Sequence, residues 1–213
     1  MSFKHDVFVS YAHVDDQAPA EVERGWVSIL VTELKRLLAE QLGRTDSFSM
    51  WMDQALSGSD RITPKIMDEL QSSAVLLVVM SPGYLASEWC STERTGFLAA
   101  AQARARAGGH LFIVEKTGVD RSKWPAEFAD VLGYRLWRPD ADSGAPRTLG
   151  YPCPDPRADR DYYRVVDDLA REMAAELNRV RAAARADTPA PADHGDSAVR
   201  VFLATVTDDL HER

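Results

Sequence analysis

The chain has 213 residues, of which 45% are hydrophobic and 27% charged, a balance typical of a soluble globular protein with one medium-sized domain. Its formal net charge of −8 argues against nucleic acid as the main partner, because phosphate binding needs a basic face. The longest apolar run is far too short for a membrane span, and Asp6 interrupts the N-terminus before a secretory leader develops. We therefore expect a cytoplasmic protein with no membrane partner.

The first third of the chain alternates predicted strands and helices. Asp6–Tyr11 is rich in β-branched and aromatic residues and predicts a first strand. Gly25–Gly43 repeats apolar residues at helical spacing and ends at a glycine, which predicts a helix. Phe48–Asp53 predicts a second strand. A second helix is expected to begin at Pro64, with Thr63 as its N-cap.

The most apolar run of the chain, Ala74–Met80, predicts a third strand. Its lack of alternation indicates burial on both faces, as in a parallel sheet. A helix is expected from about Ser87 to Ala107, followed by a fourth strand at His110–Lys116. A short helix at Ala126–Leu132 and a fifth strand at Tyr134–Pro139 complete the alternation.

The remaining chain predicts a domain boundary. Residues 140–157 are rich in proline and glycine and predict a surface excursion, and residues 161–184 predict a long amphipathic helix. A domain over residues 1–184 is then expected, with a linker at 185–197. Residues 198–213 resemble a strand and the first turn of a helix, which indicates the truncated start of a second domain.

Alternation of strands and helices over five units predicts an α/β fold. We expect a flavodoxin-like five-stranded parallel sheet, order 2-1-3-4-5, with helices on both faces. Ligands of such sheets bind outside the carboxyl ends of the strands, at the switch point between strands one and three. The loops that begin at Ser10 and at Ser81 should meet there.

The phrase SPGYLASEWCSTE, Ser81–Glu93, begins at this switch point. Trp89 and Glu93 are four residues apart, so they should share one face of a helix, and the backbone amides near Ser87 suit phosphate oxygens. Ordinary explanations exist for each residue. A helical glutamate is commonly solvated, a tryptophan commonly packs in a core, and serines at strand ends commonly bond the backbone. The residues alone leave both interpretations open.

Three segments of the sequence resemble motifs of the Toll/interleukin-1 receptor (TIR) domain family: HDVFVSYAH, MWMDQALSGSD and SPGYLASEWCSTE. The resemblance spans roughly residues 4–180. The second segment departs from the family pattern, because the usual arginine before Asp53 and the usual proline before Gly58 are absent. The third family box is matched only loosely, by RLWRP around Trp137.

The resemblance implies an NAD-cleaving TIR domain of the bacterial type, with Glu93 as the catalytic glutamate. It implies that NAD is the substrate and that no cofactor is needed. The products would be nicotinamide and ADP-ribose or a cyclic ADP-ribose. It also implies activation by TIR–TIR self-association and a role in bacterial defence or signalling. The substrate-binding residues that it implies are Ser10, Tyr11, Ala12, Asp53, Ser81, Tyr84 and Trp89.

The chemistry of this reaction suits the residues. Nicotinamide leaves as a neutral group, so no general acid is needed to protonate it, and one carboxylate suffices. The Glu93 carboxylate would hold the ribose hydroxyls and stabilise the positive charge that develops at the ribose. The Trp89 indole could stack on nicotinamide or adenine. The Asp53–Asp60 loop would form a lid or an oligomer contact.

Two other functions remain open: a non-catalytic TIR scaffold that recruits other TIR domains, and an enzyme that acts on other nucleotides, which the acidic charge disfavours. The sequence contains no GxGxxG, GxxxxGK or GxSxG motif. Its histidines lack metal-ligand spacing, and Cys90 and Cys153 form neither a disulfide framework nor a metal site.

Overall fold

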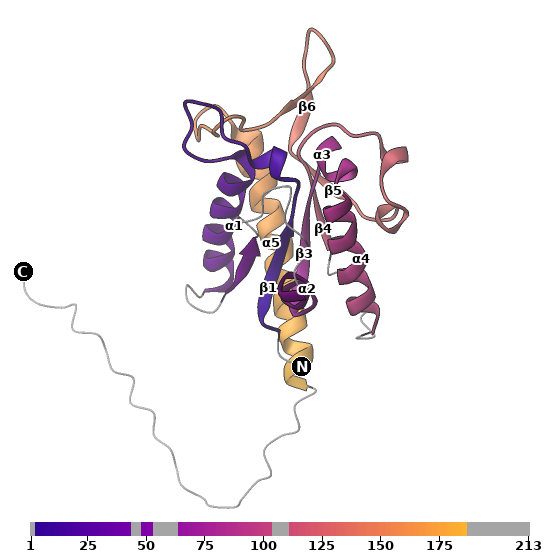
Figure 1. Ribbon diagram of the computed structural model, residues 1–213. Helices are drawn as coiled ribbons and strands as arrows, with labels where there is room; N and C mark the ends of the chain where they lie inside the picture. The colour runs from indigo at the N-terminus through magenta and orange to yellow at the C-terminus, as the bar shows by residue number, and fades with distance from the viewer. Residues whose placement is uncertain (1–2, 44–47, 53–63, 104–110, 187–213) are drawn as a thin grey trace, which may run out of the picture.

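The computed structural model describes residues 3–43, 48–52, 64–103 and 111–186 (Figure 1). Its centre is a parallel sheet of five strands in the order β2-β1-β3-β4-β5, which confirms the predicted fold class. The strands of this sheet are β1 (His5–Ser10), β2 (Met50–Met52), β3 (Ser73–Met80), β4 (Leu111–Glu115) and β5 (Gly133–Arg135).

Helices cover both faces of the sheet (Figure 1). The face formed by the first core cluster is covered by α1 (Trp26–Leu42) and α5 (Arg160–Ala186). The opposite face is covered by α2 (Pro64–Gln71), α3 (Pro82–Ala86) and α4 (Glu88–Ala103). In the described loops there are short 3₁₀ helices: η1 (His13–Asp16), η2 (Arg121–Lys123) and η3 (Ala126–Phe128).

The sheet divides the hydrophobic core into two layers. All eight residues of β3 are buried, as its uninterrupted apolar run predicts. Along β1 and the two residues after it the side chains alternate. Val7, Val9 and Tyr11 belong to the α1/α5 layer, whereas Phe8 and Ala12 belong to the α2/α4 layer. This alternation follows from the two-residue period of a strand, and it decides below which residues of the β1 carboxyl end can meet.

The region of the predicted fifth strand is divided into two strands. β5 ends at Arg135 and pairs with β4, whereas β6 (Trp137–Pro139) leaves the sheet. β6 pairs antiparallel with β7 (Pro146–Thr148), which lies inside the predicted surface excursion. The residue between β5 and β6, Leu136, is fully buried. Its amide donates to the Glu115 carbonyl at 2.9 Å, so the strand turns away where this one apolar side chain enters the core.

The helix predicted to begin at about Ser87 is confirmed at its start, but a short helix before it was not predicted. A five-residue helix, α3, comes first, and α4 starts at Glu88 after a break at Ser87. Ser87 Oγ accepts a hydrogen bond from the Cys90 amide at 3.2 Å. The predicted short helix at 126–132 is only the 3₁₀ turn η3. Small polar residues that cap backbone amides can start a new helix within a segment of helical periodicity.

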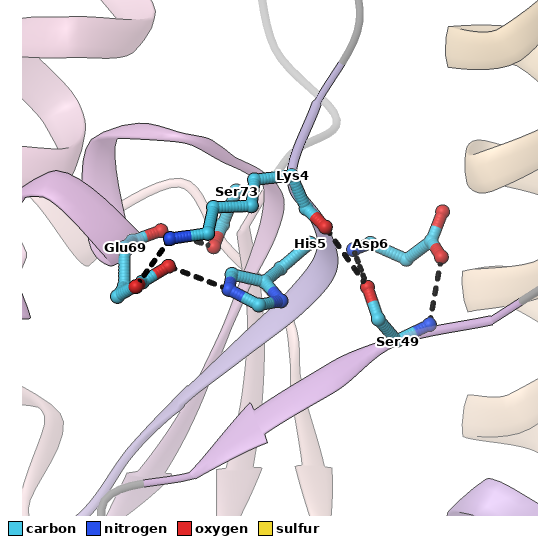
Figure 2. A network of polar contacts seen from close by, with 6 residues as sticks. All are labelled: Lys4, His5, Asp6, Ser49, Glu69 and Ser73. Carbon is cyan, nitrogen blue, oxygen red and sulfur yellow. Dashed lines mark hydrogen bonds and ion pairs between the residues drawn. The ribbon is translucent and has the colours of Figure 1, made fainter.

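Polar contacts tie the amino end of β1 to its neighbours (Figure 2). Lys4 forms an ion pair with the buried Glu69 of α2, and His5 Nε2 lies 2.7 Å from the second oxygen of that carboxylate. On the other side of the strand, Asp6 Oδ2 accepts from the Ser49 amide at 2.9 Å. These contacts fix α2 and the start of β2 against β1, at the sheet edge that the candidate site does not occupy.

Several predictions concern residues that the structure does not describe. These are Thr63 as an N-cap, the position of Asp53, and the second domain at 198–213. The linker at 185–197 overlaps the end of α5, which continues to Ala186. Within the described part of the chain, no helix has both the length and the apolar character needed to cross a membrane.

Candidate active site

The candidate site lies at the carboxyl ends of β1 and β3, the neighbours between which the strand order reverses. Ser10 is the last residue of β1, Ser81 follows β3 directly, and α4 starts seven residues later at Glu88. Parallel strands bring their carboxyl ends to one edge. The predicted residues Ser10, Ser81 and Glu93 are therefore assembled from distant segments.

The Glu93 side chain is held between two elements. Glu93 is only 3% exposed. Ser10 Oγ on β1 donates to Glu93 Oε2 at 2.5 Å, and Trp89 Nε1 donates to Glu93 Oε1 at 2.8 Å. Buried polar groups of this kind are normally hydrogen-bonded. Each carboxylate oxygen thus has a donor that fixes its direction.

Trp89 lies one helical turn before Glu93, as its spacing predicts. The indole is half-buried and packs against the α2/α4 layer of the core. Sequence reasoning assigned this ring to stacking on a substrate and did not foresee the donor role of its N–H group. The i, i+4 spacing of an indole and a carboxylate is the signal that could have indicated it.

Tyr84 of α3 is buried beside this carboxylate. Its hydroxyl has no hydrogen-bond partner among the described residues, and the residue is 1% exposed. Burial is the main reason why the pKa of the Tyr84 phenol is raised; the neighbouring Cys90 and Glu93 also raise the pKa, and Ser10 lowers it. The phenol therefore stays protonated at neutral pH and offers a buried donor next to Ser10 and Glu93.

A second network joins the loops after β1, β3 and β4. Ser81 Oγ accepts from the Tyr84 amide at 2.9 Å and donates to Asp15 Oδ2. Lys116, directly after β4, lies with Nζ 2.9 Å from Asp15 Oδ1. Ser81 was predicted to bind substrate; its hydroxyl here caps α3 and bonds Asp15. Sequence reasoning missed Asp15 and Lys116, although the position of a lysine directly after a buried strand was a signal for Lys116.

Tyr11 and Ala12, predicted to bind substrate at the end of β1, lie on opposite faces of the sheet. Tyr11 points to the α1/α5 layer and stacks on His13, with ring centroids 5.6 Å apart and an interplanar angle of 11°. Ala12 packs on the other side, close to Gly83. A Cβ atom on Gly83 would lie 2.6 Å from a Val14 methyl group, so this glycine permits the loops to approach. Ala12 therefore shares the layer of Glu93, whereas Tyr11 does not.

A cavity of about 750 Å³ lies beside Tyr11, between the loop after β1, α1 and the edge strand β2. Asp16 at its wall accepts from the Ser28 amide at 2.7 Å and from Ser28 Oγ at 2.6 Å, so its carboxylate caps the first turn of α1. Neither Glu93 nor Trp89 lines this cavity. The predicted Asp53 lies outside the described residues.

A comparison with protein families identifies the family of this chain. The family model described as TIR domain matches residues 7–149. Among solved structures, the chain is similar to the TIR domains of the activated Roq1 resistosome directly recognizing the pathogen effector XopQ, with 18% identity, 83% of each chain covered and a TM-score of 0.38. No curated protein matches the chain. Because the family match covers more than half of the chain and includes most of β1, all of β3 and the Ser81–Glu93 segment, the chain belongs to the TIR domain family.

Proposed function

We propose that this TIR domain is an NAD nucleosidase that cleaves the bond between nicotinamide and ribose. The observation that carries the proposal is the Glu93 carboxylate, oriented by Ser10 and Trp89 at the switch point of the sheet. A buried carboxylate oriented by polar groups in the ligand-binding region of a parallel sheet fits a catalytic role.

In the proposed reaction the bond between ribose C1′ and the pyridinium nitrogen breaks, and its electron pair goes to nicotinamide. Water then adds at C1′ and loses a proton, which gives ADP-ribose; closure by another nucleophilic atom of the product gives a cyclic ADP-ribose. Glu93 accepts hydrogen bonds from the ribose hydroxyls and stabilises the positive charge at the ribose. The leaving group is neutral, so a single carboxylate serves.

The other predicted residues take supporting parts in this proposal. Ser10 and Trp89 hold the Glu93 rotamer, and the Trp89 ring face remains the stacking partner that we propose for nicotinamide. Tyr84 and Ala12 belong to the core layer that α4 covers. Ser81 follows β3 directly, and the contact that we propose for Asp53 lies outside the described residues. Tyr11 lies on the face of the sheet opposite α4, so it would contact the substrate only if the substrate extended around the sheet edge.

Burial of Glu93 supports activation by self-association. At 3% exposure the carboxylate must be uncovered before it can contact a ribose. We propose that contact with a second copy of the chain shifts the loops at this edge, so that a dilute monomer has low activity. Within the proposal the enzyme is cytoplasmic and serves bacterial defence or signalling.

A scaffold without catalysis is the second candidate, and the same burial favours it. A glutamate whose two oxygens accept from Ser10 and Trp89 also serves as a structural link between β1 and α4. In that case the domain would assemble with other TIR domains and leave NAD intact.

The test is nicotinamide release from NAD, followed by chromatography over a series of protein concentrations with and without a crowding agent. Wild type should release nicotinamide faster than linearly with protein concentration. Glu93→Ala should lower the rate by about 10²–10³-fold, the usual effect of removing a transition-state contact. Glu88→Ala is the matched control, because Glu88 is an exposed glutamate in the first turn of the same helix.

The two candidates give different results. A Glu93→Ala protein that cleaves NAD at the wild-type rate would overturn the assignment of the site. Absence of release at every concentration, in a sample that light scattering shows to self-associate, would establish the scaffold.

A further inference from the structure

The cavity beside α1 is separate from the Glu93 site. Its walls are the loop after β1, the first turns of α1 and the edge strand β2, and Val31, Met50 and Met52 in its lining belong to the α1/α5 layer. The α4 residues around Glu93, among them Cys90 and Phe97, belong to the layer on the other face. A volume of about 750 Å³ is within the range of cavities that hold small ligands.

Two cations lie together on one wall. Arg24 Nη1 donates to Thr32 Oγ1 at 3.4 Å, and Lys35 lies one helical turn beyond Thr32 on the same face of α1. Both cations line the cavity. Among the described residues, neither has a carboxylate within ion-pair distance, whereas Arg36 on the outer face of the same helix pairs with Glu33 and Glu40. Arg24 and Lys35 together therefore form a candidate anion-binding site.

The acidic residues of the cavity do not neutralise this pair. Asp16 is committed to the Ser28 amide and hydroxyl at the start of α1. Glu23 is exposed and lines the cavity. No ion pair joins Glu23 to either cation in the described part of the chain. It is therefore a carboxylate that would repel a bound anion.

The end of the cavity near the start of α1 carries an aromatic surface. The Tyr11 and His13 rings stack nearly parallel, and His13 is exposed, so the outer face of its imidazole is open to a further ring. Ser28 and Lys35 are seven residues apart on α1, which corresponds to about 10 Å along the helix axis. That length fits one nucleoside phosphate.

We propose that this cavity binds a nucleoside monophosphate, with the phosphate between Arg24 and Lys35 and the base stacked on His13. The proposal is independent of NAD cleavage at Glu93. It gives the domain a second ligand site, on the face of the sheet opposite the proposed catalytic carboxylate.

The test is isothermal titration of the full chain with adenosine 5′-monophosphate. Arg24→Gln/Lys35→Gln should weaken binding by about tenfold or more, since each exposed charge contact contributes modestly. Glu23→Gln should tighten binding by about twofold to threefold, because it removes a repulsive charge. Arg157→Gln/Arg160→Gln is the matched control, since it removes the same charge at two exposed sites outside the cavity.

Further titrations locate the ligand. Adenosine and inorganic phosphate should each bind more weakly than the nucleotide, and Glu93→Ala should bind it as wild type does. Thermal unfolding of each variant checks that the fold is kept. Absence of binding at millimolar nucleotide, or binding that Glu93→Ala abolishes and Arg24→Gln/Lys35→Gln does not change, would overturn the proposal.

Discussion

Glu93 is positioned by a residue of its own helix and by a residue 83 positions earlier in the chain. Trp89 fixes one oxygen through local helical geometry, and Ser10 fixes the other through packing of α4 against β1. A carboxyl group with hydrogen bonds to both oxygens has a defined orientation. The contribution of each donor to stability and activity can therefore be measured by substituting it.

Trp89→Phe separates the donor role of the indole from its ring. The variant keeps an aromatic side chain and loses the N–H bond to Glu93, so we expect about 1.5 kcal/mol less stability in urea unfolding. If Glu93 is catalytic, kcat/KM for NAD should fall about tenfold or more.

Trp124→Phe is the control for this substitution. Trp124 Nε1 is buried without a hydrogen-bond partner among the described residues, so its removal should cost no hydrogen bond. Equal destabilisation by the two substitutions would contradict the donor role of Trp89.

At the scale of elements, Asp15 connects three loops of the carboxyl edge. Its carboxylate accepts from Ser81 after β3 and from Lys116 after β4, and the Lys116 ammonium also bonds the Asp15 carbonyl at 2.9 Å. The Asp15 and Lys116 side chains are only 10% and 13% exposed. An ion pair in such a position stabilises the fold only while both partners are present.

Lys116→Met should therefore be costly. It leaves the Asp15 carboxylate nearly buried without its cation, and we expect a loss of about 3 kcal/mol in the free energy of unfolding. Lys116→Met/Asp15→Asn should recover part of this loss, because the unpaired charge is gone. Denaturant unfolding of Lys116→Met, of Asp15→Asn and of the double variant gives the coupling energy. Additive losses would show that the pair is not coupled.

The polar contacts of Glu69 with Lys4 and His5, at the amino end of β1, predict that the free energy of unfolding depends on pH. The Lys4 ammonium holds the pKa of the Glu69 carboxyl below its ordinary value of 4.5; burial opposes this, and His5 lowers the pKa further. Since the folded pKa lies below the unfolded one, the stabilisation is present above the unfolded pKa and is lost as pH falls through the folded pKa.

Glu69→Gln tests this linkage. The melting temperature of the variant should fall below that of wild type at about pH 7, and the difference should shrink toward about pH 3. Glu88→Gln, at an exposed position of α4, should show no such trend. A difference between Glu69→Gln and wild type that is constant across the series would mean that the Glu69 charge contributes nothing.

At the scale of the whole molecule, β3 is the centre of the fold. It pairs with β1 on one side and β4 on the other, and every residue in it is buried. Leu77→Ala should cost about 3 kcal/mol, because it removes transfer free energy and leaves a cavity. The exposed Leu132 is the matched control, and Leu132→Ala should change stability by less than about 0.5 kcal/mol in the same urea titration. Similar costs at both positions would contradict the description of the core.

The sequence predicted much of this architecture because helices and strands are encoded by local periodicity. The buried run Ala74–Met80, the Gly43 helix stop and the strand order were confirmed. The short helix α3 was not predicted, and the prediction of a single fifth strand over Tyr134–Pro139 was wrong, because this segment is divided into β5 and β6. There a serine cap and one buried leucine, Leu136, override the periodicity of the segment.

By itself the sequence determined the TIR fold, the switch point and the shared helix face of Trp89 and Glu93, since these depend on residues close together in the chain or on the order of elements. Only the tertiary structure decided that Ser10 bonds Glu93 and that Asp15 meets Lys116, 101 positions away. It also decided that Tyr11 faces the α1 cavity, on the other side of the sheet from Glu93. Such pairs form because packing brings distant elements together, and no local pattern specifies which side chains then meet.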